Sequence, residues 1–247
     1  MLKFILRSLS IGKGTVTMSV RTTFSVVSTQ QLLGRPLNDV EEKYNPNPLY
    51  LASCRSIPVP GPRTAIVGSR KASSQGIEAA TEIASFLVKK DVVIVSGLAE
   101  GIDTSAHKTA IEKGGSTIAV LGTPLNKAYP AKNKELQDTI MQKHWAVSQF
   151  SIGQPIQPKN FVLRNRTMAL ICDASIIVEA GETSGSLHQG WEALRLGRPL
   201  FIWKTIVRNH SLKWPDDMMK YGAMELNEPE EIMENLPSPK RTLEIAI

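Results

Sequence analysis

The stretch "TAIVGSRKASSQGIEAATEIASFLVKKDVVIVSG", residues 64–97, decides the fold because it holds a strand, a helix and a second strand in succession. The runs "TAIVGS" (64–69) and "VVIVSG" (92–97) have continuous apolar centres, and "IEAATEIASFLVKK" (77–90) between them carries apolar residues at helical spacing. Apolar runs that do not alternate with polar residues indicate strands covered on both faces, as in a parallel sheet. The stretch therefore predicts one strand–helix–strand unit of a parallel sheet.

The same alternation continues as far as residue 203. Strands are predicted at 116–122, 145–150, 174–181 and 199–203, helices at 103–114, 129–143 and 185–197, and the segment 161–173 takes the remaining helical place. Helices that connect parallel strands cross over the faces of the sheet. We therefore predict an α/β fold with a doubly wound, mostly parallel, Rossmann-like sheet and helices on both faces.

The chain outside this repeat is less regular. We assign residues 46–203 to the Rossmann-like domain, 1–45 to a basic N-terminal extension and lead-in, and 204–247 to a C-terminal tail packed on the core. The tail holds one predicted helix, "PEEIMENL" (229–236), and is too short to predict a winged helix. The first 38 residues contain basic residues and no acid, which fits a mitochondrial transit peptide, a loose basic arm, or translation from upstream of a true start at Met18.

The overall composition is that of a globular protein with a basic surface. Of 247 residues, 42% are hydrophobic and 21% are charged, and the net charge is +6. This charge favours anionic partners such as nucleic acid or nucleotides, although a solvated basic surface explains it equally well. Cys54 and Cys172 lie far apart and have no metal-site spacing, so we expect reduced core thiols in a cytoplasmic protein. No apolar run approaches the roughly 20 residues of a membrane helix, and we expect no membrane association.

Ligands of doubly wound sheets bind where loops leave the carboxyl ends of the strands. Four stretches take that place here, namely "VGSRK" (67–71), "VSGLAEGID" (95–103), "VLGTPLNKAYP" (120–130) and "VEAGETSGS" (178–186). In the first of them, the backbone amides of Gly68 and Ser69 are expected to form a small anion-binding nest backed by the positive end of the next helix. Arg70 would close over the anion with a planar fork suited to phosphate. An exposed arginine in an ordinary turn fits the same residues equally well.

The second of these stretches has a structural explanation as well as a functional one. Gly97 and Gly101 allow either close approach of a ligand to the backbone or simply a tight turn. Asp103 is expected to cap the next helix rather than to act as a catalyst. His107 follows one turn later, where packing or hydrogen bonding is a commoner role than that of a base.

The fourth stretch is expected to form a second phosphate loop. Gly181, Gly185 and Ser186 precede a helix and can present backbone amides to an anion. Glu179 and Glu182 would repel such a ligand, so we expect them to face an arginine of the protein or the solvent.

Downstream of these loops, "PKNFVLRNR" (158–166) combines cations with a ring. Lys159, Arg164 and Arg166 surround Phe161 in the sequence. Cations that follow phosphates beside a ring on which a base can stack are the components of a groove for single-stranded nucleic acid. The alternative is an ordinary helix start with the ring in the core and the cations solvated. The sequence shows no nucleophile with an adjacent base, no paired carboxylates, no Walker loop and no metal cluster, so we expect binding rather than catalysis, without a cofactor or metal.

Five motifs taken in order, "AIVGSRKAS", "VSGLAEGIDTSAH", "TIAVLGTPLNKAYPAKN", "NFVLRNR" and "VEAGETSGSL", resemble the DprA/Smf family of DNA-processing proteins from about residue 46 to 199. The resemblance implies a cytoplasmic, homodimeric protein that binds single-stranded DNA and delivers it to a RecA-type recombinase during natural transformation. It also implies that the DNA is bound, in part through its phosphates, by Gly68, Ser69, Arg70, Lys71, Ser96, Gly97, Lys159, Asn160, Phe161, Arg164, Arg166, Gly185 and Ser186.

The sequence departs from the family pattern at two places. Family members usually follow the last strand with a "VPG"-type turn, whereas this chain has "FIWKTIVRNHS" (201–211). Many members also have a helical domain before the Rossmann-like domain and a winged helix after it. In this sequence the part before the domain is short, and the part after Trp203 is too short to predict a winged helix. These departures affect the recombinase assignment more than DNA binding in the core.

Two alternative functions belong to other classes. The superfamily that this resemblance implies also includes enzymes similar to LOG-type phosphoribohydrolases, which cleave nucleoside monophosphates with an arginine and a "PGGxGTxxE" loop. Here the comparable loop is "AGETSGSLHQ" (180–189), and Gln189 replaces its glutamate. An amide cannot act as that carboxylate, and Glu192 stands one helical turn later. The other alternative is a sensor that binds a small nucleotide, for which salt dependence would be weaker than for a DNA strand.

Overall fold

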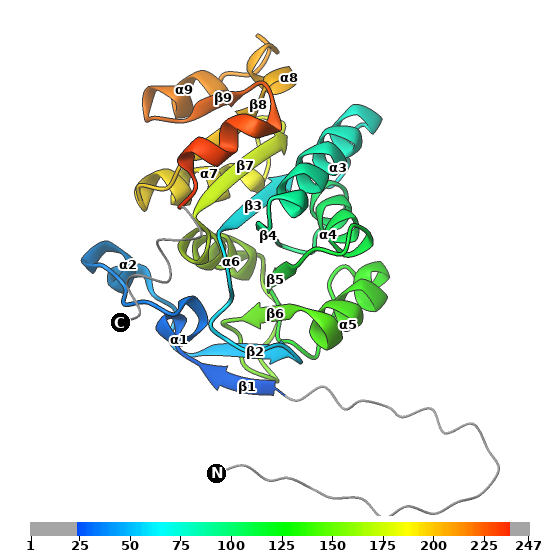
Figure 1. The fold of residues 1–247 in the computed structure, drawn as a ribbon, viewed down its shortest axis with the longest axis vertical. Helices are drawn as coiled ribbons and strands as arrows, with labels where there is room; N and C mark the ends of the chain where they lie inside the picture. Colours follow the sequence, from blue (N-terminus) through cyan, green and yellow to red (C-terminus); the bar gives the residue numbers. More distant parts are fainter. Residues whose placement is uncertain (1–23, 238–247) are drawn as a thin grey trace, which may run out of the picture.

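The computed structural model describes residues 24–237, so most of the predicted basic extension lies outside the described residues. A single nine-stranded sheet crosses this part of the molecule in the order β1-β2-β6-β5-β4-β3-β7-β8-β9 (Figure 1). The strands are β1 Phe24–Val27, β2 Leu49–Ser53, β3 Arg63–Gly68, β4 Val93–Ser96, β5 Thr117–Leu121, β6 Trp145–Ser148, β7 Ala174–Glu179, β8 Leu200–Trp203 and β9 Met224–Leu226.

Seven neighbouring strands, from β6 to β9 in the sheet order, run parallel, and β1 and β2 add antiparallel pairs at one edge. The prediction of a mostly parallel, doubly wound sheet is confirmed. The segments on either side of the predicted repeat also contribute strands to it. Before the repeat, β1 of the predicted lead-in pairs with β2, and β2 pairs with β6. After the repeat, β9 of the predicted tail pairs with β8.

Helices cover both faces of the sheet, as predicted (Figure 1). The α-helices are α1 Thr29–Leu33, α2 Asp39–Tyr44, α3 Ser74–Lys89, α4 Ile102–Glu112, α5 Lys134–Lys143, α6 Pro158–Ile171, α7 Ser186–Arg195, α8 Lys204–Val207 and α9 Trp214–Lys220. Two 3₁₀ helices, η1 Ala131–Asn133 and η2 Pro229–Asn235, complete the set, so the helix expected near residues 229–236 forms with the tighter 3₁₀ geometry.

The alternation of side chains along β3 separates two apolar cores. Ile66 belongs to the core beneath α3 and α4, whereas Ala65 and Val67 belong to the core beneath α6 and α7. All three side chains are almost completely buried. A strand with apolar residues on both faces is what a two-sided α/β sheet requires. Cys172 also lies in the core, but Cys54 is exposed, so the expectation of two core thiols is wrong for Cys54.

The direction of winding reverses between β3 and β7. The chain passes from β3 through β4, β5 and β6 toward one edge, and then returns to place β7 on the other side of β3. The loops that leave the carboxyl ends of β3 and β7 therefore diverge, and a crevice opens between them. Among residues 24–237, no helix combines the length and the apolar character needed to cross a bilayer.

Candidate nucleic-acid interface

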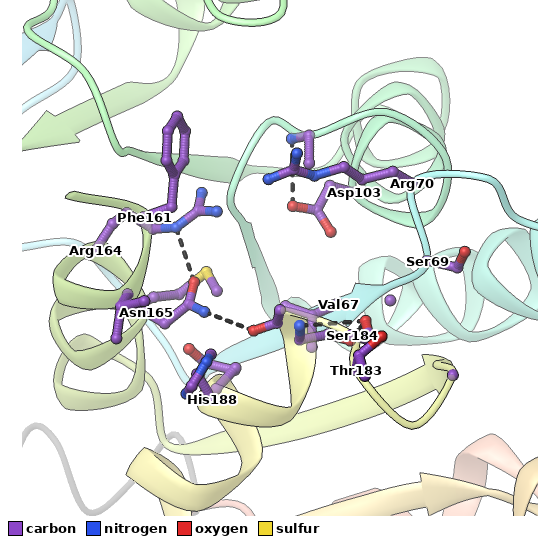
Figure 2. Close-up of a pocket in the computed structure, with 18 of the residues that line it drawn as sticks. Val67, Ser69, Arg70, Asp103, Phe161, Arg164, Asn165, Thr183, Ser184 and His188 are labelled. Atoms are coloured by element: carbon purple, nitrogen blue, oxygen red, sulfur yellow. Dashed lines mark hydrogen bonds between the residues drawn. The ribbon is translucent and has the colours of Figure 1, made fainter. Parts of the chain in front are cut away.

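A cleft of about 560 Å³ opens at this reversal point (Figure 2). Its size falls within the range of about 300 to 1,000 Å³ that is usual for ligand sites. The cleft is lined by the ends of β3 and β7 and by α6 and α7, with the residues Val67, Gly68, Ser69, Arg70, Lys71, Ala99, Asp103, Phe161, Val162, Arg164, Asn165, Met168, Gly181, Thr183, Ser184, Gly185, Ser186, His188 and Gln189.

The loop after β3 is tied to its neighbours by its backbone. The amide of Ser69 donates to the Glu179 carbonyl at 2.7 Å, and the amide of Ile102 donates to the Ser69 carbonyl at 3.3 Å. At Gly68 a Cβ atom would stand 2.6 Å from Ile102 Cγ1, so only glycine fits this packing. Because the Ser69 amide is used within the protein, the expected anion-binding nest at Gly68 and Ser69 is wrong.

The positive end of α3 is also occupied. Glu179 accepts hydrogen bonds from the Ser73 amide at 3.1 Å and from the Ser73 hydroxyl at 2.5 Å, at the N-cap of that helix. A carboxylate at a helix N-terminus is stabilising, but it removes this end of the helix as an anion site. The expectation that Glu179 faces an arginine or solvent is therefore wrong. Glu182 is exposed to solvent as expected, and it also accepts from the Lys213 amide at 2.5 Å.

The side chain of Arg70 extends over the cleft toward Phe161 (Figure 2). The carbon of its guanidinium lies 5.8 Å from the centre of the Phe161 ring, within the range of a cation–π contact. The ring itself rests on Gly122, where a Cβ atom would approach Phe161 Cδ1 to 2.6 Å. Arg70 and Lys71 are both exposed. The mouth of the cleft thus presents two cations beside a half-buried aromatic ring.

Arg164 forms the floor between the loops after β4 and β5. Its Nη1 donates to the carbonyls of Gly97 and Val120, the latter at 2.9 Å, and its Nε donates to Asn165 Oδ1 at 2.9 Å. Burial lowers the pKa of this guanidinium, and the nearby carboxylate of Asp103 opposes the lowering. Arg164 therefore holds the β4–α4 loop in place while adding positive charge beneath the cleft.

Asp103 has a different role from the one expected. The N-cap of α4 is Gly101, and Asp103 accepts from the amides of Gly97 and Ala99 at 3.1 and 3.3 Å. Burial raises its pKa, and the charge of Arg164 opposes the rise. The expected helix cap is thus wrong, although a structural role for this carboxylate is confirmed. His107 is a buried hydrogen-bonding residue as expected, since its Nδ1 lies 2.7 Å from Thr117 Oγ1.

Helix α6 divides the cations that are adjacent in the sequence. Phe161 and Arg164 line the cleft. Arg166 lies about 140° around the helix from Phe161, where it pairs with Glu192 at 3.3 Å and stands 5.1 Å from the centre of the Tyr44 ring. Lys159 is exposed in the first turn, outside the residues that line the cleft. Asn160 is buried and donates to the Pro155 carbonyl at 3.2 Å.

Two further predicted residues lie behind the cleft. Ser96 is fully buried and donates to the Ile66 carbonyl at 2.6 Å, between β4 and β3. Gly97 is buried against the Arg164 guanidinium, where a larger residue would collide with it. Of the thirteen residues predicted to bind DNA, the structure brings eight together on the cleft, namely Gly68, Ser69, Arg70, Lys71, Phe161, Arg164, Gly185 and Ser186.

The loop after β7 forms the opposite wall. The hydroxyls of Ser184 and Ser186 lie 2.6 Å apart, and Asn165 Nδ2 donates to the Gly185 carbonyl at 3.0 Å. Sequence reasoning missed Asn165, His188 and Gln189 in this wall. The helical period contained a signal for Asn165, because it stands four residues after Phe161 and shares its face of α6.

The cleft does not contain the carboxylate that a LOG-type hydrolase needs at its loop. Gln189 is buried there and donates to Ser175 Oγ at 3.0 Å. Glu192 lies outside the lining, where Arg166 and Arg195 bind its carboxylate at 3.3 and 3.0 Å. Among the described residues of the lining, the one carboxylate is Asp103, which is engaged by two backbone amides.

Comparisons with known proteins agree on one family. A family model described as DNA recombination-mediator protein A matches residues 38–237. DNA processing protein DprA of Streptococcus pneumoniae is 44% identical over 140 residues, which are 57% of this chain and 49% of that protein. The chain spans about half the length of such curated relatives.

Solved structures show the same likeness. The structure of DNA processing protein A from Streptococcus pneumoniae has a TM-score of 0.72 at 30% identity and covers 87% of this chain and 75% of its own. DNA processing protein A from Helicobacter pylori, studied for its single-stranded DNA binding mode, has a TM-score of 0.71 over 91% of this chain and 98% of its own. At 23% sequence identity, this likeness supports a shared fold only.

Proposed function

Because the chain belongs to the DNA recombination-mediator protein A family, we propose that it binds single-stranded DNA in the cleft between the loops that follow β3 and β7. The observation that carries this proposal is the position of Arg70, whose guanidinium lies 5.8 Å from the centre of the Phe161 ring at the mouth of that cleft. A cation beside a half-buried ring that lines the cleft matches the repeating unit of a strand, which alternates phosphate and base.

Side chains supply the binding energy in this proposal. Arg70 binds a phosphate with its planar fork, and Lys71 adds a second positive charge. A base stacks on Phe161, which contributes about 1 to 3 kcal/mol for any of the four bases. Binding is therefore sequence-tolerant, and duplex DNA binds more weakly because its bases already stack on one another.

The cellular assignment follows the family and the relatives. We propose that residues 46–203 form the DNA-binding domain of a cytoplasmic, non-enzymatic homodimer. It protects incoming single strands during DNA uptake and helps to load a RecA-type recombinase on them. The support for this assignment is the family match over residues 38–237 and the likeness to DNA processing proteins.

The test is fluorescence anisotropy of a labelled oligothymidylate in a salt series, with the wild type and an Arg70→Ala, Phe161→Ala double variant. We expect wild-type affinity to fall steeply with salt, because each phosphate contact releases counterions. The double variant should lose most of the affinity while still unfolding in a single cooperative thermal transition.

Failure of the wild type to bind the strand at low salt would remove the DNA proposal. The volume of about 560 Å³ also suits one nucleotide, so nucleoside monophosphates are the second ligand class to titrate. A mononucleotide makes few phosphate contacts, and its affinity would change little with salt.

A further inference from the structure

A second cavity of about 200 Å³ adjoins the cleft on the other side of Arg70. Its walls include Tyr129, Pro130, Glu100 and Phe161. This volume is below the range of about 300 to 1,000 Å³ usual for a complete ligand site. The cavity therefore suits a planar fragment such as one nucleobase rather than a whole nucleotide.

The outer wall of this cavity is aromatic. The rings of Tyr129 and Phe161 have centroids 5.2 Å apart and are tilted by 47°. Tyr129 is 46% exposed although its ring packs against another ring, so part of it remains available to a ligand. Tyr129 and Arg70 line the same small cavity, so this cavity combines an aromatic ring with a cation, as the larger cleft does through Phe161 and Arg70.

The loop that carries Tyr129 is anchored from below. Asn133 is 5% exposed, and its Nδ2 donates to the Leu98 carbonyl and to Thr104 Oγ1, each at 2.9 Å. Lys132 forms an ion pair with Glu100 at 2.5 Å across the rim. These contacts fix the β5–α5 loop to the β4–α4 loop. A wall held in place before binding loses less entropy when a ligand enters.

Arg70 and Lys71 line both cavities, so a phosphate bound by them lies on the boundary between the two. We propose that the small cavity is a second base-binding slot, in which Tyr129 stacks on the base adjacent to the one on Phe161. This inference rests on the proposed DNA function. The unit recognised by this face of the protein is then a dinucleotide step. Its phosphate binds Arg70, and its two bases occupy separate cavities.

The test compares two probes of equal length by anisotropy, an oligothymidylate and a strand of abasic sugar phosphates. Tyr129→Ala should weaken binding of the oligothymidylate by about five- to 150-fold, the value of one stacked base. The same change should alter binding of the abasic strand by less than about twofold, since the tyrosine then has no base to contact. Tyr129→Phe retains the ring and should bind both probes as the wild type does.

Tyr221→Ala is the matched control. Tyr221 is 72% exposed, its ring centroid lies 5.4 Å from that of Trp191, and it lines neither cavity. The slot is overturned if Tyr129→Ala binds oligothymidylate as tightly as the wild type while Arg70→Ala does not, and DNA binding in the cleft then still stands. It is also overturned if Tyr129→Ala weakens both probes equally, which would assign the residue to the backbone. Absence of wild-type binding to either probe would remove both proposals together.

Discussion

Arg70 contacts the Phe161 ring and, in our proposal, also binds a phosphate. It stands two residues after the end of β3, it is exposed, and its guanidinium lies beside the Phe161 ring. The neighbouring amide and the neighbouring helix end are both used within the protein, by the Glu179 carbonyl and the Glu179 carboxylate. In our proposal, Arg70 supplies the positive charge that the backbone of a glycine-rich phosphate loop would otherwise supply.

Substitutions of Arg70 separate its charge from its shape. Arg70→Ala should weaken binding to oligothymidylate by about 10- to 150-fold, the value of a charged hydrogen bond. The slope of the logarithm of the affinity against the logarithm of the salt concentration should become shallower by about 0.7, because one phosphate contact is lost. Arg70→Lys should restore the slope but only part of the affinity, because an ammonium lacks the planar fork. Arg208→Ala removes an arginine that is paired with Glu225 outside the cleft and serves as the control. An unchanged slope in Arg70→Ala would mean that this residue contacts no phosphate.

Gly122 sets the position of the stacking ring. A methyl group there would stand 2.6 Å from Phe161 Cδ1, so Gly122→Ala should displace the ring without straining the backbone. We expect affinity for single strands to fall by roughly 1 kcal/mol or more, within the value of one stacked base. The melting temperature should change by no more than about 4 °C. Wild-type affinity in this variant would show that the observed ring position is not the binding position.

His107 makes stability depend on pH. Burial lowers the pKa of His107 to about 3 from its ordinary value near 6.5. The unfolded chain therefore binds a proton that the folded chain does not bind between about pH 6.5 and 3, and stability must fall as the pH falls through this window. A titrating group of this kind changes the free energy of unfolding by up to about 1.4 kcal/mol per pH unit. His107 therefore lowers the free energy of unfolding by roughly 2 kcal/mol between pH 7 and pH 5.

Urea unfolding at pH 7 and pH 5 measures this effect. His107→Gln should be less stable than the wild type at pH 7, yet should lose roughly 2 kcal/mol less on acidification. The carboxylates of the two proteins titrate alike, so the difference isolates the imidazole. Equal losses in the two proteins would assign the acid sensitivity to other groups.

At the scale of single elements, α6 shows what a sequence motif predicts and what it hides. The segment forms a helix that brings Phe161 and Arg164 to the cleft. Adjacency in the sequence nevertheless suggested one cluster of cations, whereas the helix places Arg166 on the side of Tyr44 and Glu192. The helical period of 3.6 residues separates positions 161 and 166, and it could have been applied to the sequence alone.

Arg166→Ala tests this division. The variant should bind oligothymidylate within about twofold of the wild type, because the side chain is directed away from the cleft and is neutralised by Glu192. Its free energy of unfolding should fall by up to about 1 kcal/mol, the value of a partly exposed ion pair. Anisotropy and urea unfolding on one preparation give both numbers. A loss of affinity comparable to that of Arg70→Ala would mean that Arg166 contacts the DNA strand.

Contacts distant in sequence account for most of what sequence reasoning missed in the site. Glu179 reaches Ser73 across 106 positions, and this pairing occupies the helix end that the motif alone seemed to offer an anion. Arg164 likewise reaches Gly97 across 67 positions. Such pairs depend on which strands are neighbours in the sheet, and that order does not follow from the period of any one segment.

At the scale of the whole molecule, the central repeat was predictable because each element is marked by its own period. Continuous apolar strands and amphipathic helices alternate between residues 64 and 203, and each predicted strand there is present in the sheet. Strands β1 and β2 were not predicted, because β2 lies among prolines and asparagines and β1 is only four residues long. Their place at the edge of the sheet comes from the long-range pairing of β2 with β6, to which β1 is added by pairing with β2.

The reversal between β3 and β7 opens a cleft at whose mouth Arg70 lies beside Phe161, and Phe161 in turn packs against Tyr129. Our account places the DNA strand there, with its phosphate on Arg70 and its bases on Phe161 and Tyr129. Ultraviolet crosslinking of an oligothymidylate that carries 5-iododeoxyuridine, followed by mass spectrometry of the peptides, measures that placement most directly. The account predicts crosslinks in the peptides that contain Phe161 or Tyr129, and their loss in Arg70→Ala. Crosslinks confined to peptides away from the cleft, such as those of β1 or β9, would contradict it.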